Sequence, residues 1–185
     1  MKIERHTLET APAEAREQLE GAKAKLGFIP NLYAGMANSP AMLKTYLTFA
    51  ENLAEFGQLT PVEQQVAYLT ISAENGCTYC VGAHSVLASM VDIPEDTLAE
   101  LRAQQPLSDP KLNAIRNLSL ELIKHRGWVS ENELDDFIGA GFNQSHVLEI
   151  ITILAQKTMS NYFNHIAQTP LDEQFASMAW ESTDA

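Results

Sequence analysis

The sequence is short of several patterns, and each shortage excludes a class of protein. Only 12 Lys and Arg stand against 24 Asp and Glu in 185 residues, a formal net charge of -12. Nucleic-acid binding requires clustered basic side chains that neutralise phosphates, so nucleic acid is not expected as a partner. No stretch approaches the roughly 20 apolar residues of a membrane span, and residues 1–10 lack the apolar run of a signal peptide. We therefore expect a cytoplasmic protein without membrane association.

The apolar–polar alternation that marks β-strands between hairpin turns is also missing. Apolar residues instead recur at helical spacing, after caps such as Ser39-Pro40 and Thr60-Pro61. The predicted helices cover approximately residues 12–26, 40–56, 60–74, 77–90, 94–103, 110–126, 130–139 and 143–168, and residues 28–33 form a connector on the core. A chain of this length fits one domain. We predict an all-α, single-domain helical bundle of about eight helices over residues 1–185, with an N-terminal helical extension at about 1–30 and no significant β-sheet.

Cysteine is scarce, and the two cysteines lie close together. Cys77 and Cys80 are three positions apart, and His84 follows four positions later. On a helix this spacing places the three side chains on one stripe, and helical neighbours three apart fall within the roughly 4.4 to 6.8 Å Cα separation of disulfides. A bridge closing so short a loop adds little stability, and a close cysteine pair in a reducing compartment is more often catalytic or metal-binding. The spacing therefore favours a redox dithiol.

Two other interpretations of these residues stay open. Zinc sites use three or four protein ligands, and Cys77, Cys80 and His84 supply three, although a second Cys-x-x-Cys is absent and the other histidines lie far away in sequence. The pair is also compatible with two unreactive buried thiols. A thioredoxin fold is excluded because the Cys-x-x-Cys lies in no βαβ pattern.

Residues 75–84, which read Asn-Gly-Cys-x-Tyr-Cys-x-x-x-His, resemble the signature of the alkyl hydroperoxidase D (AhpD) family, within the carboxymuconolactone decarboxylase-like superfamily. The helix over 59–72, and Ala-Gly-Phe at 140–142 before a long helix, extend the resemblance to about residues 30–170, with the redox motif at 74–84. The resemblance implies an antioxidant peroxidase that reduces a hydroperoxide substrate, holds no metal or tightly bound cofactor, and is re-reduced by an external dithiol or lipoyl-bearing protein. It also implies a homo-oligomer, a trimer or hexamer.

The residues alone leave open which sulfur attacks. A thiol is a few per cent ionised at neutral pH, so lowering its pKa by about two units makes the thiolate predominant. The positive end of the helix dipole favours Cys77, whereas an imidazole one turn beyond Cys80 favours Cys80. The resemblance implies that Cys80 is the peroxidatic residue, that Cys77 resolves its sulfenic acid into a disulfide, and that His84 transfers protons.

The chain departs from the family pattern beside the motif. The founding hydroperoxidases are understood to have a glutamate twelve positions before the first motif cysteine, where this chain has Gln65. An amide orients an imidazole by hydrogen bonding but carries no proton. Glu63 lies about 200° around the helix from Gln65 and is a poor substitute. Tyr79 stands where some members have a histidine, so Gln65 and Tyr79 are candidates for supporting the site.

Other functional classes remain as alternatives. One is a decarboxylase of the same superfamily, although those enzymes are understood to lack the dithiol, and another is a non-enzymatic redox or metal-responsive module. The end of the last predicted helix is also unusually polar, and we expect its residues either to contribute to the site or to satisfy hydrogen bonds at a helix or subunit contact. These residues are Asn161, Tyr162, Asn164 and His165.

Overall fold

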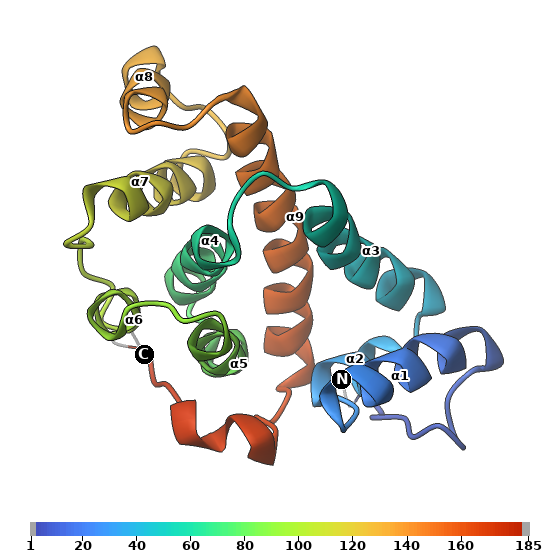
Figure 1. Ribbon diagram of the computed structural model, residues 1–185. Coiled ribbons are helices and arrows are strands. Elements are labelled where there is room, and N and C mark those ends of the chain that lie inside the picture. Colours follow the sequence, from blue (N-terminus) through green and yellow to red (C-terminus); the bar gives the residue numbers. More distant parts are fainter. Residues whose placement is uncertain (1–2, 183–185) are drawn as a thin grey trace.

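The described part of the chain is entirely helical. The computed structural model describes residues 3–182, so the ends of the predicted domain, 1–2 and 183–185, lie outside the described residues. Within 3–182 there are nine α-helices, one 3-10 helix and no strand, which confirms the all-α prediction (Figure 1). The elements are α1 (Ala13–Leu26), α2 (Asn31–Met36), α3 (Pro40–Phe56), α4 (Pro61–Glu74), α5 (Thr78–Met90), α6 (Glu95–Arg102), α7 (Pro110–Lys124), α8 (Glu131–Gly139), α9 (Gln144–Ala167) and the 3-10 helix η1 (Glu173–Met178).

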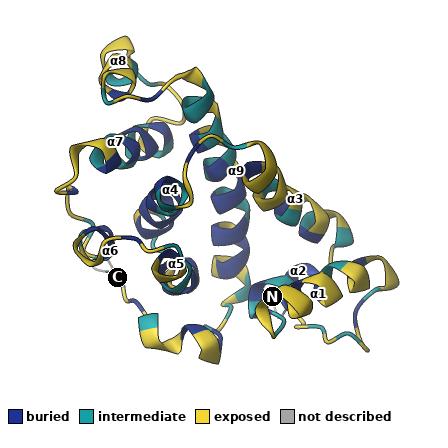
Figure 2. Cartoon of the chain, in the orientation of Figure 1, coloured by how far each residue is buried: buried dark blue, intermediate teal, exposed yellow. Residues whose placement is uncertain are grey.

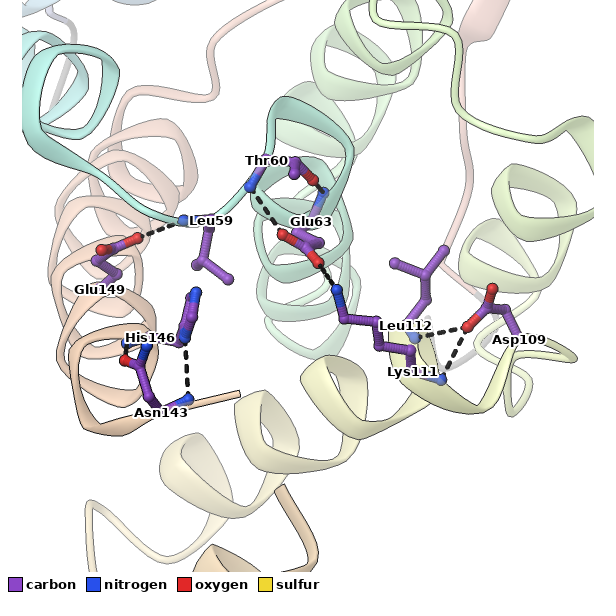
Figure 3. Close-up of polar contacts among 9 residues, drawn as sticks. All are labelled: Leu59, Thr60, Glu63, Asp109, Lys111, Leu112, Asn143, His146 and Glu149. Atoms are coloured by element: carbon purple, nitrogen blue, oxygen red, sulfur yellow. Dashed lines mark hydrogen bonds and ion pairs between the residues drawn. The ribbon is translucent and has the colours of Figure 1, made fainter. Parts of the chain in front are cut away.

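Capping residues fix where several helices start. At α4 the Thr60 hydroxyl accepts a hydrogen bond from the Glu63 backbone N–H, and the Glu63 carboxylate accepts one from the Thr60 N–H at 2.7 Å. The same carboxylate pairs with Lys111 of α7 at 2.8 Å (Figure 3). Asn143 and His146 form an equivalent box at the start of α9. Each cap contributes about 0.5–2 kcal/mol, and Glu63 is fully engaged at the start of α4.

Helix α4 lies in the middle of the bundle. It packs against α5, α7 and α9 (Figure 1), and nine of its fourteen residues are buried. A helix that is covered on several sides is expected to be apolar around most of its circumference. Figure 2 shows the consequence, because α4 is largely dark blue whereas α8 at the edge of the bundle is largely exposed. The motif that follows α4 therefore starts from the centre of the molecule.

Two hydrophobic clusters make up the core, and α9 contributes to both. The larger cluster centres on α4 and α7 and includes Ile150 and Ile153 of α9. The smaller cluster is formed by α1, α2, α3 and the start of α5, and it contains Cys77, Cys80 and Phe163 of α9. Although α9 has 24 residues, no helix within 3–182 is long and apolar enough to cross a membrane.

The prediction for residues 28–33 was wrong in part, because α2 begins at Asn31 inside the expected connector. Contacts remote in sequence explain this helix. The Asp172 carboxylate accepts a hydrogen bond from the Asn31 N–H at 3.0 Å. A Cβ built on Gly35 would lie 2.7 Å from the Phe163 ring of α9, so a larger residue at position 35 would displace that ring. Element η1, after the last predicted helix, was not predicted either.

Candidate active site

The motif lies at a sharp turn between α4 and α5. Gly76 has a positive φ of 64°, a conformation that favours glycine. The Cys77 N–H then donates to the Ser72 carbonyl at 2.9 Å, and Cys77 directly precedes the first residue of α5. Cys80 therefore lies in the first helical turn, where the unpaired N–H groups and the helix dipole favour a negative charge.

Both cysteines are free and buried, each with about 1% of its surface exposed. The Cys77 thiol donates a hydrogen bond to the Cys80 sulfur. From α9, the Asn164 Nδ2 lies 3.3 Å from Cys80 Sγ and 3.8 Å from Cys77 Sγ, and the Ser160 Oγ lies 3.8 Å from Cys80 Sγ. The Cys80 sulfur is thus surrounded by groups that can donate hydrogen bonds to a thiolate.

A buried lysine on α9 faces the same sulfur. The Lys157 side chain has no exposed surface, and its Nζ lies 4.0 Å from Cys80 Sγ and 2.7 Å from His84 Nε2. The same ammonium lies 5.2 Å from the centre of the Tyr68 ring, within the range of a cation–π contact. In the part of the chain that the structure describes, no carboxylate lies within ion-pair distance of Lys157.

His84 is held between Lys157 and Gln65. A lysine ammonium only donates hydrogen bonds, so the Nε2 that faces Lys157 is an acceptor. The proton of the neutral ring then sits on Nδ1 and is donated to Gln65 Oε1 at 2.9 Å. Loss of solvation, and next the charge of Lys157, keep the pKa of His84 well below its usual value. Within residues 3–182 no hydrogen bond joins His84 to either sulfur.

These contacts set the two thiols apart. The hydrogen bond from Cys77 is the largest influence on Cys80, and together with the charge of Lys157 it outweighs burial and lowers the pKa of Cys80 to about 5. The pKa of Cys77 is raised, because Cys77 is the donor of that bond and because it is buried. The negative charge therefore belongs on Cys80, with Cys77 as its protonated neighbour.

A cavity of about 250 Å³ gives access to this sulfur. Its walls include Cys80, His84 and Lys157, while Cys77 is not among the described residues that line it. Exposed Leu26 and Ala50 lie at its edge. Aromatic rings form much of the remaining wall, namely those of Tyr33, Tyr46, Tyr68, Tyr79 and Phe175.

The candidate residues found by sequence have different positions in the site. Gln65 contacts His84 as an orienting amide would. Tyr79 lines the cavity, but its hydroxyl donates to the buried Asp172 carboxylate at 2.6 Å and accepts from the Leu32 N–H at 3.3 Å. Glu63 lies at the start of α4 in its capping box, so the expectation that it cannot replace the family glutamate agrees with its position.

Some of the polar residues at the end of α9 contact the sulfurs, and another makes a hydrogen bond between helices, the two roles expected from the sequence. Asn164 contacts both sulfurs, and Asn161 accepts a hydrogen bond from the Asn75 side chain at 2.8 Å. Tyr162 and His165 are exposed. Lys157 was missed by the sequence analysis. One signal for it exists, because Lys157 is the single lysine of α9 and lies four positions after the buried Ile153, on the same side of the helix.

The described residues contain no group of three or more His, Cys, Asp or Glu side chains placed to hold a metal ion. Cys77 directly precedes α5 and Cys80 and His84 lie on it, but the Lys157 ammonium is hydrogen-bonded to His84 Nε2, one of the two ring nitrogens that can bind a metal. A positive charge at that point is unfavourable for a cation.

Comparisons with known proteins identify the fold and the family that part of the chain resembles. Residues 40–109, which span α3 to α6, match the model of the carboxymuconolactone decarboxylase family. No curated protein sequence matches the chain. The fold is similar to that of an alkylhydroperoxidase AhpD-core protein from Ralstonia eutropha JMP134, an uncharacterized peroxidase-related protein, with 22% identity, 96% and 97% of the two chains covered and a TM-score of 0.83.

Two further solved structures share the fold. An uncharacterized peroxidase-related protein from Silicibacter sp. TM1040 is 18% identical, with 95% of this chain and 92% of the other covered and a TM-score of 0.78. The debrominase Bmp8, solved as a cysteine-to-alanine variant with 2,3,4-tribromopyrrole, is 15% identical, with 96% and 95% covered and a TM-score of 0.74. At these identities the structures establish a common fold, and the family match establishes the resemblance over residues 40–109.

Proposed function

Since residues 40–109 carry the pattern of the carboxymuconolactone decarboxylase family and the fold is that of the AhpD core, we propose that this protein is a thiol-dependent peroxidase of the AhpD type. Cys80 is the peroxidatic residue, Cys77 is the resolving residue, and His84 assists the proton transfer. The observation that carries the proposal is the contrast between the two sulfurs: Cys80 lines the cavity beside a buried cation, and Cys77 donates a hydrogen bond to it.

The proposed reaction uses two electrons from the dithiol. The Cys80 thiolate attacks the terminal oxygen of a hydroperoxide, so that an S–O bond forms, the O–O bond breaks and the leaving alkoxide takes a proton. The resulting sulfenic acid is attacked by Cys77, which forms the disulfide and releases water. An external dithiol of the lipoyl type then reopens the bridge by thiol–disulfide exchange. No tightly bound cofactor takes part.

The test is peroxide consumption driven by dihydrolipoamide. We expect turnover by the unaltered chain, and its loss in Cys80→Ser, Cys77→Ser and His84→Ala. A stoichiometric dose of peroxide should remove two free thiols per chain and leave a trappable sulfenic acid on Cys80 in Cys77→Ser. A sulfenic acid only on Cys77, in Cys80→Ser, would reverse the two roles. An unchanged thiol count would instead favour the decarboxylase or a non-enzymatic role.

A second reaction is suggested by the cavity walls. Rings of Tyr33, Tyr46 and Tyr68 surround the approach to Cys80, which suits a flat aromatic substrate, and the structural neighbour Bmp8 is a debrominase. In a reductive debromination the thiolate would take the bromine from carbon, the ring carbanion would take a proton, and Cys77 would displace bromide to form the same disulfide. Release of bromide from a bromopyrrole, absent in Cys80→Ser, would support this reaction over peroxide reduction.

We also propose that the protein is cytoplasmic and forms a homo-oligomer, a trimer or hexamer, in which α9 contacts another copy. The exposed side of α9 is apolar, with Leu148, Ile151, Tyr162 and Ile166 between 43% and 64% exposed. Glu149 is the only acidic residue of α9, and it accepts hydrogen bonds from the Gln58 and Leu59 N–H groups. Two such faces can meet without the repulsion that a net charge of -12 otherwise imposes. Sedimentation of Ile151→Asp against the unaltered chain tests this contact.

A further inference from the structure

Lys157 is a buried positive charge, and its surroundings offer one group as its counter-ion. It is fully buried, and no carboxylate in the described residues pairs with it. An unpaired buried charge is costly, so buried charges are generally paired with an opposite charge. The groups that face Lys157 and can become anionic are two thiols and three phenols, on α2, α3, α4 and at the start of α5. They are Cys77, Cys80, Tyr33, Tyr46 and Tyr68.

Four of these five groups are held in the neutral form. Burial raises the pKa of each tyrosine hydroxyl, and the hydrogen bond to Cys80 raises the pKa of Cys77. Cys80 is the exception, because it receives hydrogen bonds and lies 4.0 Å from the ammonium. The counter-ion of Lys157 is therefore the Cys80 sulfur.

Among the described residues, His84 has no hydrogen bond to the Cys80 sulfur and contacts Lys157 instead. Its Nε2 accepts from Lys157 at 2.7 Å, and its Nδ1–H donates to Gln65 at 2.9 Å. The ring also stacks on Tyr68 with the centroids 4.6 Å apart. Both nitrogens are occupied, so the imidazole fixes the position of the ammonium.

We infer that Lys157 is a catalytic residue, which pairs with the Cys80 thiolate in the reduced protein and delivers the proton to the leaving oxygen. His84 and Gln65 are positioning residues that act through Lys157. The proton delivery rests on the proposed peroxidase function, whereas the pairing with the thiolate does not depend on it.

The step balances over the redox cycle. The reduced site holds a Cys80 thiolate, a protonated Lys157 and a Cys77 thiol. When the thiolate attacks a hydroperoxide, Lys157 gives its proton to the departing alkoxide, which leaves as an alcohol. Cys77 then displaces hydroxide from the sulfenic acid, and the Cys77 proton combines with that hydroxide as water. The oxidised site holds a disulfide and a neutral amine. An external dithiol returns two electrons, one proton to Cys77 and one proton to Lys157.

The first test needs no peroxide, because the ultraviolet absorbance of the thiolate is followed against pH in the reduced protein. In the unaltered chain one thiol should titrate near pH 5. In Lys157→Met the same thiol should titrate at a clearly higher pH than in the unaltered chain, because the charge of Lys157 is lost while the hydrogen bond from Cys77 remains. Lys44→Met is the matched control, since Lys44 is exposed on α3, and it should titrate as the unaltered chain does. Alkylation rates are a poorer readout, because a thiolate of higher pKa is also a better nucleophile.

The second test separates holding the charge from giving the proton. Lys157→Arg keeps a positive charge, but a guanidinium does not release its proton. The variant should keep an acidic Cys80 thiolate and lose about 100-fold or more in peroxide turnover, the usual contribution of a general acid. Lys157→Met should lose both properties.

Several results would overturn these assignments. A Lys157→Met chain with an unaltered titration contradicts the pairing, and a Lys157→Arg chain with full turnover contradicts the proton delivery. If Lys157→Met does not fold, a midpoint near about 8.5 in the unaltered chain contradicts the pairing by itself. An acidic thiolate without any peroxide turnover would overturn the proposed function and the proton delivery together, and would support the pairing.

Discussion

The pH dependence of stability gives a quantitative measure of the Lys157–Cys80 pair. In the native reduced protein the pKa of Cys80 is lowered to about 5, whereas a thiol in an unfolded chain has a pKa of about 8.5. A group with a depressed native pKa contributes stability above its unfolded pKa, and the contribution is lost as the pH falls to the native pKa. The free energy of unfolding should therefore rise from about pH 5 to about pH 8.5.

Lys157→Met should reduce this rise. Without the charge of Lys157 the native pKa of Cys80 is higher, so the native and unfolded states differ in bound protons over a narrower pH range. One proton of difference is worth about 1.4 kcal/mol per pH unit, so the unaltered chain should gain stability relative to the variant between about pH 7 and pH 8.5, by at most roughly 2 kcal/mol. This window lies above the pKa of about 6.5 of a histidine in an unfolded chain, so the protonation of His84 contributes little to the change in stability across it.

The assay is urea unfolding of the reduced proteins at the two pH values, followed by helical circular dichroism. The absolute stability of the variant carries no information, because replacing a buried charge by an apolar side chain is often neutral or stabilising. The change between the two pH values is the diagnostic quantity, and Lys44→Met should show the same change as the unaltered chain. Parallel curves for Lys157→Met and the unaltered chain would refute the reasoning.

Three further substitutions test the supporting residues. Asn164→Asp replaces the amide donor 3.3 Å from Cys80 Sγ by an acceptor. Repulsion between the two negative charges should raise the Cys80 pKa and slow peroxide turnover at least tenfold. Thiolate absorbance measures the pKa, and stopped-flow oxidation measures the rate. Tyr79→Phe removes one of the donors to the buried Asp172 carboxylate, which keeps the Asn31 N–H, and should cost about 1–3 kcal/mol of stability in thermal unfolding. Gln65→Glu places a carboxylate against His84 Nδ1 and should raise the His84 pKa, visible in the imidazole proton resonances by NMR; an unmoved resonance would contradict that contact.

Local signals were sufficient to predict most of the helices. Caps such as Ser39, Thr60 and Ser130 act on the residues that directly follow them, so the predicted starts of α3, α4 and α8 fall within one residue of the observed ones. Helix α2 could not be predicted in this way. Its first N–H is satisfied by Asp172, more than 140 residues away, and no pattern around residue 31 reveals that partner.

The same division applies to the site. Cys77, Cys80 and Gln65 were found because a motif and a fixed spacing mark them, and His84 lies on the same helix as the dithiol. The α9 residues are 77 to 87 positions from the sulfurs they contact, and only the packing of α9 against α5 brings them there. The single lysine of α9, four positions after Ile153, was the available signal. A lysine on the buried side of a helix generally needs a paired charge.

The replacement of the family glutamate by Gln65 is consistent with the pairing of Lys157. In a buried site an excess charge is costly. The stability of each redox state therefore depends on the sum of the charges in the site. With Gln65, the reduced site contains one thiolate and one ammonium, and the oxidised site contains a disulfide and a neutral amine, so both sums are zero. A carboxylate at position 65 would add a negative charge to both states, beside His84 Nδ1. Gln65 therefore supplies the acceptor that His84 needs without adding a charge to the buried site.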